Sequence, residues 1–127
     1  MDYFPKRIVC LTEETTETLY LLGEQDRIVG ISGFTVRPTK ARKEKPKVST
    51  FLDAKIDEIL SLKPDLVIGF SDIQANIAKE LIAQGVTVWI NNYRRVEGIL
   101  NMMMQLGVLV GQKEKALKLV EDIQSEI

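Results

Sequence analysis

Residues 51–90 read FLDAKIDEILSLKPDLVIGFSDIQANIAKELIAQGVTVWI, and this stretch decides the fold of the 127-residue chain. A helical pattern of apolar residues precedes Leu66-Val67-Ile68, a short apolar run of the kind that forms a strand buried on both faces. A second helical pattern runs from Ile73 to Ile82, and the run 86–90, rich in β-branched residues, follows it. Helix, strand, helix and strand thus alternate with short connections, which predicts a parallel sheet covered by helices.

Residues known to start and stop helices stand at the expected places in this stretch. Asp53 is a candidate N-cap of the first helix, and Lys63-Pro64-Asp65 ends it. Ser71 and Gln74 have the spacing of a capping box, and Gly85 stands where the C′ residue of the second helix belongs.

The rest of the chain extends the same pattern. Apolar runs at 7–11 and 28–32 predict two further strands, separated by a helix that begins after Thr12, carries two acids in its first turn and ends near Gly23. Residues 33–48 read as a basic loop with a short helical turn. Two helical stripes, separated by Gly111, occupy 95–127, and the methionines at 102–104 are assigned to core packing. The sequence predicts a single α/β lobe over residues 1–127.

Composition excludes several classes of function. The net charge of −1 gives no overall attraction to nucleic acid or to an anionic membrane, so no nucleic-acid partner is expected. The chain has no histidine, which removes the commonest general base and metal ligand, so no metal site is predicted. Ser71 stands at a strand-to-helix turn like a nucleophile elbow, but no histidine is present to activate it. An enzyme acting through Ser71 or Glu13 is therefore disfavoured, and no catalytic residue is predicted.

Binding residues are expected at the carboxyl ends of the strands, where open parallel sheets hold their ligands. Four aromatic residues fall at such connections, and rings placed there either hold a large flat ligand or cap the core; both readings stay open. Arg37 in the basic loop faces either solvent or an anionic group of a ligand. The predicted ligand-binding residues are Phe34, Arg37, Thr50, Phe51, Phe70, Ser71 and Tyr93.

Three segments also carry a family resemblance: RIVCLTEETTETLYLLGEQDRIVGIS at 7–32, LSLKPDLVIG at 60–69 and LIAQGVTVW at 81–89. In this order they resemble the N-terminal lobe of the substrate-binding proteins that serve cobalamin, haem and ferric-siderophore ABC importers, over residues 7 to about 123. The resemblance implies a three-layer, Rossmann-like open sheet of about four parallel strands in the spatial order 2-1-3-4. It also implies that the C-terminal helical part begins the long helix that joins two lobes.

The resemblance further implies a ligand and partners. The ligand would be a corrinoid, haem or ferric siderophore, bound without a covalent link, and the partners would be an ABC permease and its ATPase. Phe34, Phe51 and Phe70 align with positions where cobalamin-binding relatives place aromatics against the corrin. Asp57 aligns with an exposed acid that docks on the permease, although aspartate replaces the more usual glutamate; an ordinary solvated helix face explains Asp57 equally well.

Two further expectations concern compartment and assembly. The chain starts without a recognisable leader, so it is cytoplasmic as written, or periplasmic or at the cell surface if a leader has been removed. The cytoplasmic case would suit a signal-less interaction or ligand-sensing domain that has no transport role. The stripe Ala116, Val120, Ile123 and Ile127 would lack a partner within one lobe, which predicts a homo-oligomer formed through the C-terminal helix.

Overall fold

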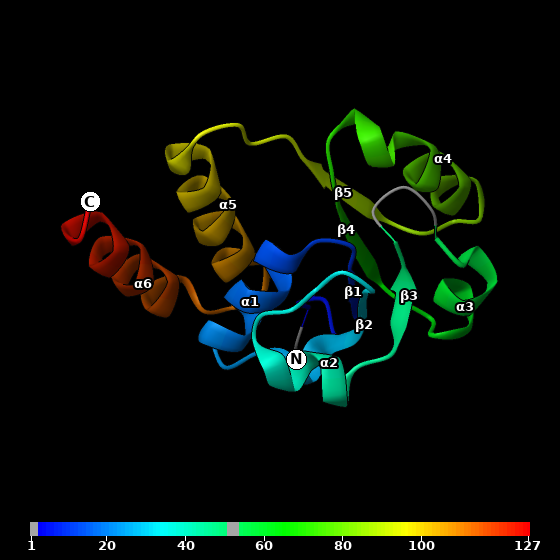
Figure 1. Ribbon diagram of the computed structural model, residues 1–127, viewed down its shortest axis with the longest axis horizontal. Helices are drawn as coiled ribbons and strands as arrows, with labels where there is room; N and C mark the ends of the chain where they lie inside the picture. The colour runs from blue at the N-terminus through cyan, green and yellow to red at the C-terminus, as the bar shows by residue number, and fades with distance from the viewer. Residues whose placement is uncertain (1–2, 51–53) are drawn as a thin grey trace.

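The computed structural model describes residues 3–50 and 54–127 and shows a parallel sheet with helices on both faces (Figure 1). In chain order the strands are β1 (Ile8–Cys10), β2 (Ile28–Ser32), β3 (Lys47–Ser49), β4 (Leu66–Phe70) and β5 (Val88–Asn91). They lie in the order β3-β2-β1-β4-β5, and all four pairings between neighbouring strands are parallel. The chain order therefore reverses at β1, which has β2 on one side and β4 on the other.

The predicted order of four strands is confirmed, and a fifth strand extends the sheet beyond it. This strand, β3, lies next to β2 inside the segment predicted as a basic loop. Only Val48 of its three residues is apolar and buried, whereas Lys47 is exposed. A three-residue edge strand with one buried apolar side chain leaves too short a pattern to be recognised in the sequence.

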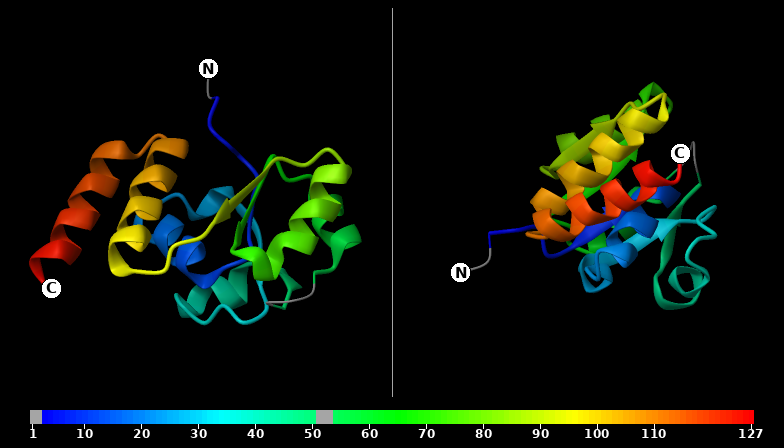
Figure 2. Two further views of the ribbon diagram at one scale, coloured as in Figure 1. Left: turned by 90° about the horizontal axis from the view of Figure 1, so that it is seen from above. Right: turned by 90° about the vertical axis from the view of Figure 1, so that its left-hand side faces the viewer.

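Helices form the two outer layers (Figures 1 and 2). In the described residues the α-helices are α1 (Glu13–Leu21), α2 (Thr39–Glu44), α3 (Ile56–Ser61), α4 (Ala75–Ala83), α5 (Val96–Leu109) and α6 (Lys113–Ser125). Two short 3-10 turns, η1 (Gln25–Arg27) and η2 (Asp72–Gln74), precede β2 and α4. Helices α3 and α4 cover one face of the sheet, and α1 and α5 cover the other, with α6 outside α5. None of the helices in the described segments is long and apolar enough to cross a membrane.

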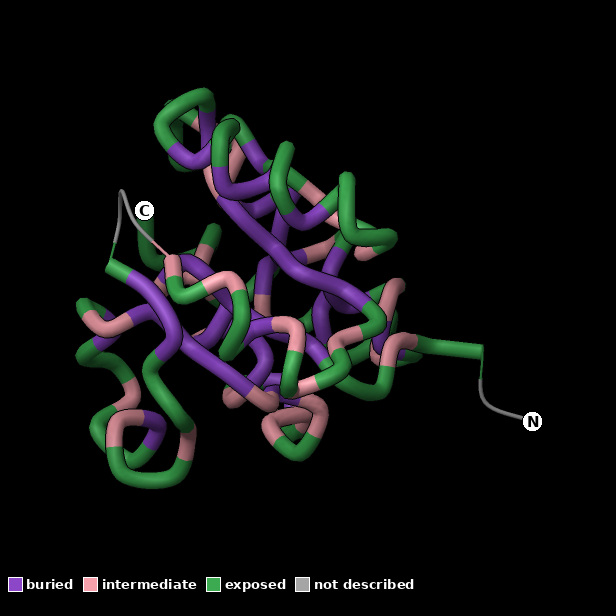
Figure 3. Tube along the Cα trace, turned by 90° about the vertical axis from the view of Figure 1, so that its right-hand side faces the viewer, coloured by how far each residue is buried: buried purple, intermediate pink, exposed green. Residues whose placement is uncertain are grey.

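The central strands are buried on both faces, as a parallel sheet with two helical layers requires (Figure 3). In β1, Ile8 and Cys10 pack with residues of α1, α5 and α6, whereas Val9 faces the cluster formed with α3 and α4. Met102 and Met103 are buried in the first of these clusters, which confirms their assignment to the core.

Helices α5 and α6 pack closely against each other. Gly107 lies opposite Ala116, and a Cβ atom at Gly107 would overlap the Ala116 Cβ. Ala116 and Val120 are buried, and Ile123 packs on the same core cluster. The predicted unpaired stripe on the C-terminal helix is therefore wrong for these residues, because α5 supplies their apolar partner; only Ile127, 81% exposed, stays open.

Two predicted helix starts differ in detail. Helix α3 begins at Ile56 with Lys55 as its N-cap, and Asp53 lies outside the described residues. Thr12 is the N-cap of α1, as predicted, but its hydroxyl makes no bond to the helix backbone. Instead, the hydroxyls of Thr12 and Thr15 hydrogen-bond to each other, with 2.8 Å between their Oγ1 atoms.

Candidate functional site

The carboxyl ends of the five strands form one edge of the sheet, which we call the rim. It comprises residues 11–14, 32–37, 49–50, 70–74 and 91–93, all at or directly after strand ends. The rim is centred on β1, where the strand order reverses, and this is the place where open α/β sheets bind ligands.

Phe70 and Tyr93 meet at the rim, although they are 23 positions apart in the sequence. Phe70 is the last residue of β4 and pairs with Asn91 of β5, which brings the following connection beside it. The two half-buried rings lie with centroids 4.7 Å apart and planes tilted by 38°. Gly98 in α5 makes room for this arrangement, since a Cβ atom there would lie 2.8 Å from the Cβ of Tyr93.

The phenol of Tyr93 is anchored to α1, at the centre of the rim. Its hydroxyl donates a hydrogen bond to Oε1 of Glu14 in α1, at 2.7 Å. Burial raises the pKa of Tyr93 well above its usual range, and the hydrogen bond to the Glu14 carboxylate raises it further. The phenol therefore stays protonated near neutral pH and keeps donating to Glu14.

Phe34 follows β2 and stands on the other side of β1 from the Phe70–Tyr93 pair. Phe34 is 38% exposed, so part of its surface can contact another molecule. The backbone around it is held by Arg42, whose Nη1 donates to the carbonyl oxygens of Gly33 at 2.9 Å and Thr35 at 2.8 Å. The amides of Val36 and Arg37 donate to Oε2 of Glu13, at 2.8 and 3.1 Å.

The guanidinium of Arg37 lies against α1. Its Nη2 is 3.1 Å from Oε1 of Glu13, and its Nε is 3.8 Å from Oε2 of Glu17. Partial burial raises the pKa of Glu13, but the two backbone amides and the Arg37 guanidinium outweigh it and hold the pKa below its usual value. The cation predicted to face a ligand is thus paired with two carboxylates of α1, and direct ligand contact by Arg37 stays a prediction.

Ser71 forms the sharp turn that follows β4. Its φ of 58° lies in the left-handed region, its amide donates to the Asn91 carbonyl at 2.7 Å, and its buried hydroxyl accepts from the Ile73 amide at 3.2 Å. The hydroxyl therefore caps η2, but it accepts from the Ile73 amide and not from the Gln74 amide that the predicted capping box would use. Contact of Ser71 with a ligand stays a prediction.

The Gln74 half of that capping box is also wrong. Gln74 does not reach back to the Ser71 amide; its Oε1 accepts from the Phe70 amide at 2.8 Å. Its Nε2 donates to the Leu11 carbonyl at 3.2 Å, and the side chain is fully buried. Ser71 has a positive φ and gives its amide to Asn91, and Gln74 instead ties the carboxyl ends of β1 and β4 together.

The remaining predicted residues lie at one end of the rim or on α3. Thr50 is exposed directly after β3, beside a hollow of about 320 Å³, and Phe51 lies outside the described residues. Asp57 is exposed in the first turn of α3, on the side opposite the buried Ile59, so it is free for docking or for solvent. Its role stays a prediction.

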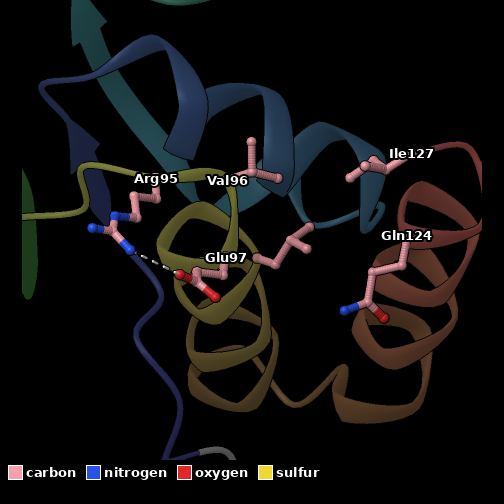
Figure 4. Close-up of a pocket in the computed structure, with 6 residues that line it drawn as sticks. Arg95, Val96, Glu97, Gln124 and Ile127 are labelled. Atoms are coloured by element: carbon pink, nitrogen blue, oxygen red, sulfur yellow. Dashed lines mark ion pairs between the residues drawn. The ribbon is translucent and has the colours of Figure 1, made fainter.

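A larger hollow, of about 460 Å³, opens between the start of α5 and the end of α6 (Figure 4). Val96 and Ile127 project into it, Gln124 faces it from α6, and an Arg95–Glu97 ion pair of 3.9 Å lies at one side. None of the predicted ligand-binding residues that the structure describes lines this hollow. Self-association through this face stays a prediction.

Three side chains at the rim make hydrogen bonds that connect its segments, and the sequence did not predict this role for them: Glu13, Glu14 and Gln74. Glu14 and Tyr93 are 79 positions apart, so no local pattern joins them. The available signal was the position of both acids directly after a strand that ends at the rim.

The chemistry of the rim favours binding over catalysis. The Ser71 hydroxyl is engaged by a backbone amide. In the part of the chain that the structure describes, no three His, Cys, Asp or Glu side chains come together as a set of metal ligands. Half-buried rings bordered by hydroxyl and amide groups suit a large, flat, mostly apolar molecule with a polar edge.

Comparisons with known proteins match the chain to binding proteins. A family model described as periplasmic binding protein matches residues 8–127. The chain is 31% identical over 125 residues to a vitamin B12-binding protein from Vibrio parahaemolyticus, covering 96% of this chain and 44% of that protein. It is 30% identical over 127 residues to YvrC, an uncharacterized ABC transporter substrate-binding lipoprotein from Bacillus subtilis, covering 97% and 40%.

A solved structure shows the same fold. A periplasmic haem-binding protein from Pseudomonas aeruginosa superposes with a TM-score of 0.87 at 24% identity, covering 95% of this chain and 44% of that one. The chain spans less than half the length of each of these three relatives. The relatives whose names state a function are binding proteins rather than enzymes.

Proposed function

The chain belongs to the periplasmic binding protein family, and we propose that it is one lobe of the substrate-binding component of an ABC importer. The proposed ligand is a large cofactor-like molecule of the cobalamin, haem or ferric-siderophore class. The observation that carries the proposal is the rim, where the Phe70–Tyr93 ring pair stands on one side of β1 and Phe34 on the other.

The rim offers the contacts that such a ligand needs. A macrocycle or a siderophore complex presents broad apolar surface with polar groups at its edge. Phe34, Phe70 and Tyr93 supply partly exposed ring surface, and an aromatic contact contributes about 0.5–1.5 kcal/mol beyond the area that it buries. Thr50 and Ser71 are proposed to add contacts at the margin, as are Phe51 and Arg37.

Cobalamin is the first ligand to test within this class. The Vibrio parahaemolyticus relative, at 31% identity, is named for binding vitamin B12. The haem-binding structure is less similar in sequence and supports the fold alone. Haem and ferric siderophores therefore enter the proposal through the shared shape of such ligands.

A complete binding site is proposed to need a second surface facing the rim. One lobe covers one side of a bulky ligand, and binding must also offset the lost freedom of the ligand. The matched relatives are more than twice as long as this chain. We propose that a second lobe supplies the facing surface and that α6 begins the helix connecting the two.

The proposed partners and location follow from the same family. The loaded protein would deliver its ligand to an ABC permease with its ATPase, and Asp57 on α3 is the proposed docking acid. Delivery to an importer places the protein outside the cytoplasmic membrane, and the B. subtilis relative is named a lipoprotein. The names of the relatives give no support to a cytosolic sensing domain.

The experiment is a calorimetric titration of the full-length natural protein with cyanocobalamin, haemin and ferric catecholate and hydroxamate siderophores. We expect at least one to bind with a Kd of about 1 μM or tighter, and Phe70→Ala and Tyr93→Ala to weaken it about three- to tenfold. Ile82→Ala, at an exposed position of α4, is the matched control and should leave the affinity unchanged. No binding of any of these ligands, or equal binding by all four proteins, would refute the proposal.

A further inference from the structure

We propose that Glu13 and Glu14, adjacent residues in the first turn of α1, are positioning residues that set the two sides of the ligand-binding rim. Glu13 holds the loop that carries Phe34, and Glu14 holds Tyr93 beside Phe70. The inference rests on the proposed function, because that proposal names the ligand that the rim would contact. It adds a reason why rings on separate loops keep a fixed spacing.

On the Phe34 side of the rim, Glu13 accepts three hydrogen bonds from one short loop. Oε2 accepts from the backbone amides of Val36 and Arg37, and Oε1 accepts from the Arg37 guanidinium at 3.1 Å. The Glu13 side chain is only 15% exposed, so these bonds compete with little water. Bonds from backbone amides fix the path of the chain itself, and that path begins at Phe34.

On the other side of the rim, Glu14 makes one hydrogen bond, to a residue 79 positions away in the sequence. Tyr93 donates to Oε1 at 2.7 Å, while the ring of Tyr93 leans on Phe70 at 4.7 Å and its backbone lies against Gly98. The ring is thus held by its hydroxyl, its face and its backbone at once. A phenol-to-carboxylate bond is charge-assisted and about twice as strong as one between neutral groups.

The helical turn that carries both acids is itself held firmly. The Thr15 and Thr16 hydroxyls donate to the Thr12 carbonyl at 3.2 and 3.0 Å, and the Thr18 hydroxyl donates to the Glu14 carbonyl at 2.7 Å. All of these threonines are buried. The turn follows β1, where the strand order reverses, and successive helical residues point about 100° apart. Adjacent acids therefore reach the loops on opposite sides of β1.

The test measures hydrogen exchange in the full-length protein without ligand. Glu13→Ala should speed exchange of the amides at 35–37 about tenfold and leave 92–95 unchanged; Glu14→Ala should do the reverse. In Glu13→Gln the exchange rate of the amides at 35–37 should lie between those of Glu13→Ala and the natural protein. The glutamine oxygen still accepts from backbone amides, but the side chain carries no charge. Glu17→Ala, which removes only the 3.8 Å contact to Arg37, is the matched control and should change neither segment.

A second measurement follows the Tyr93 phenol and the ligand. Glu14→Gln should lower the pKa of Tyr93 in an ultraviolet absorbance titration, with Tyr93→Phe identifying its signal. If cyanocobalamin binds, Glu14→Ala and Tyr93→Phe should each weaken it about threefold, and the double variant should be no weaker than either one. Additive losses would show that Glu14 does not act through Tyr93.

The outcomes separate this inference from the proposed function. Exchange that is unchanged in both segments, or that rises equally across β1 and β4, overturns the positioning role whether or not a ligand binds. If the natural protein binds none of the tested ligands but the exchange changes are segment-specific as expected, the proposed ligand class is overturned. The positioning of the rim is then still established. If an alanine variant does not fold, its glutamine counterpart, which keeps the volume of the side chain, decides by the same two readouts.

Discussion

Glu13 illustrates at the scale of one residue how charge, backbone and loop position depend on one another. Its carboxylate faces the Arg37 guanidinium and two backbone amides, while Glu17, one helical turn further along α1, contacts the same guanidinium. These contacts outweigh the effect of partial burial and hold its pKa below the ordinary value of 4.5. A depressed pKa means that the folded state prefers the charged form, which couples stability to pH.

The resulting prediction is a pH-dependent stability difference between the natural protein and Glu13→Gln. Above about pH 4.5 the unfolded and folded carboxyls are both ionised, so the full stabilisation by Glu13 is present. As the pH falls through the depressed pKa of the folded state, protonation of Glu13 removes this stabilisation. The free energies of unfolding of the two proteins should then converge. Urea unfolding at a series of pH values measures this.

The control for this prediction is Glu17→Gln, whose longer contact to Arg37 should give a smaller and flatter difference. A difference between the natural protein and Glu13→Gln that stays constant from neutral to acid pH would contradict the account.

The residues of the site were predictable from the sequence only in part. Phe34, Phe70 and Tyr93 could be placed at the rim because aromatics directly after predicted strands fall on one edge of a parallel sheet, and their contact with a ligand stays a prediction. That Phe70 and Tyr93 touch, and that Arg37 turns toward α1, depends on side-chain partners far apart in the sequence. No local pattern encodes such pairs.

At the scale of elements, helix spacing is set by small residues. Gly107 allows α6 to approach α5 until the Ala116 Cβ occupies the place where a side chain at 107 would begin. The sequence predicted both helices and the break at Gly111, where φ is 73°. It did not reveal the edge strand β3, since a single buried valine carries no periodicity.

Gly107→Val is therefore expected to separate the two helices. The added side chain must displace the Ala116 Cβ, which moves only with α6, and we expect the free energy of unfolding to fall by about 1–3 kcal/mol. Gln105→Val, at an exposed position of α5, introduces the same β-branched side chain without the contact and serves as the control. Urea unfolding together with amide exchange in α6 measures the effect; equal stability of the two variants would contradict it.

At the scale of the whole molecule, the sheet order makes one edge the meeting point of distant segments. Parallel strands with right-handed crossovers send every connection after a strand to the same rim, so residues 34, 70 and 93 converge there. The larger hollow, between α5 and α6, is lined by none of the predicted binding residues within segments 3–50 and 54–127. Ligand contact is therefore proposed for this one edge of the sheet.

The measurement that tests this claim most directly is the amide-exchange footprint of a bound ligand on the full-length protein. With saturating cyanocobalamin, or whichever tested ligand binds, the account predicts slower exchange within this chain at 33–37, 70–74 and 91–95. Slower exchange confined to the facing ends of α5 and α6, or to the amino ends of the strands, would contradict it.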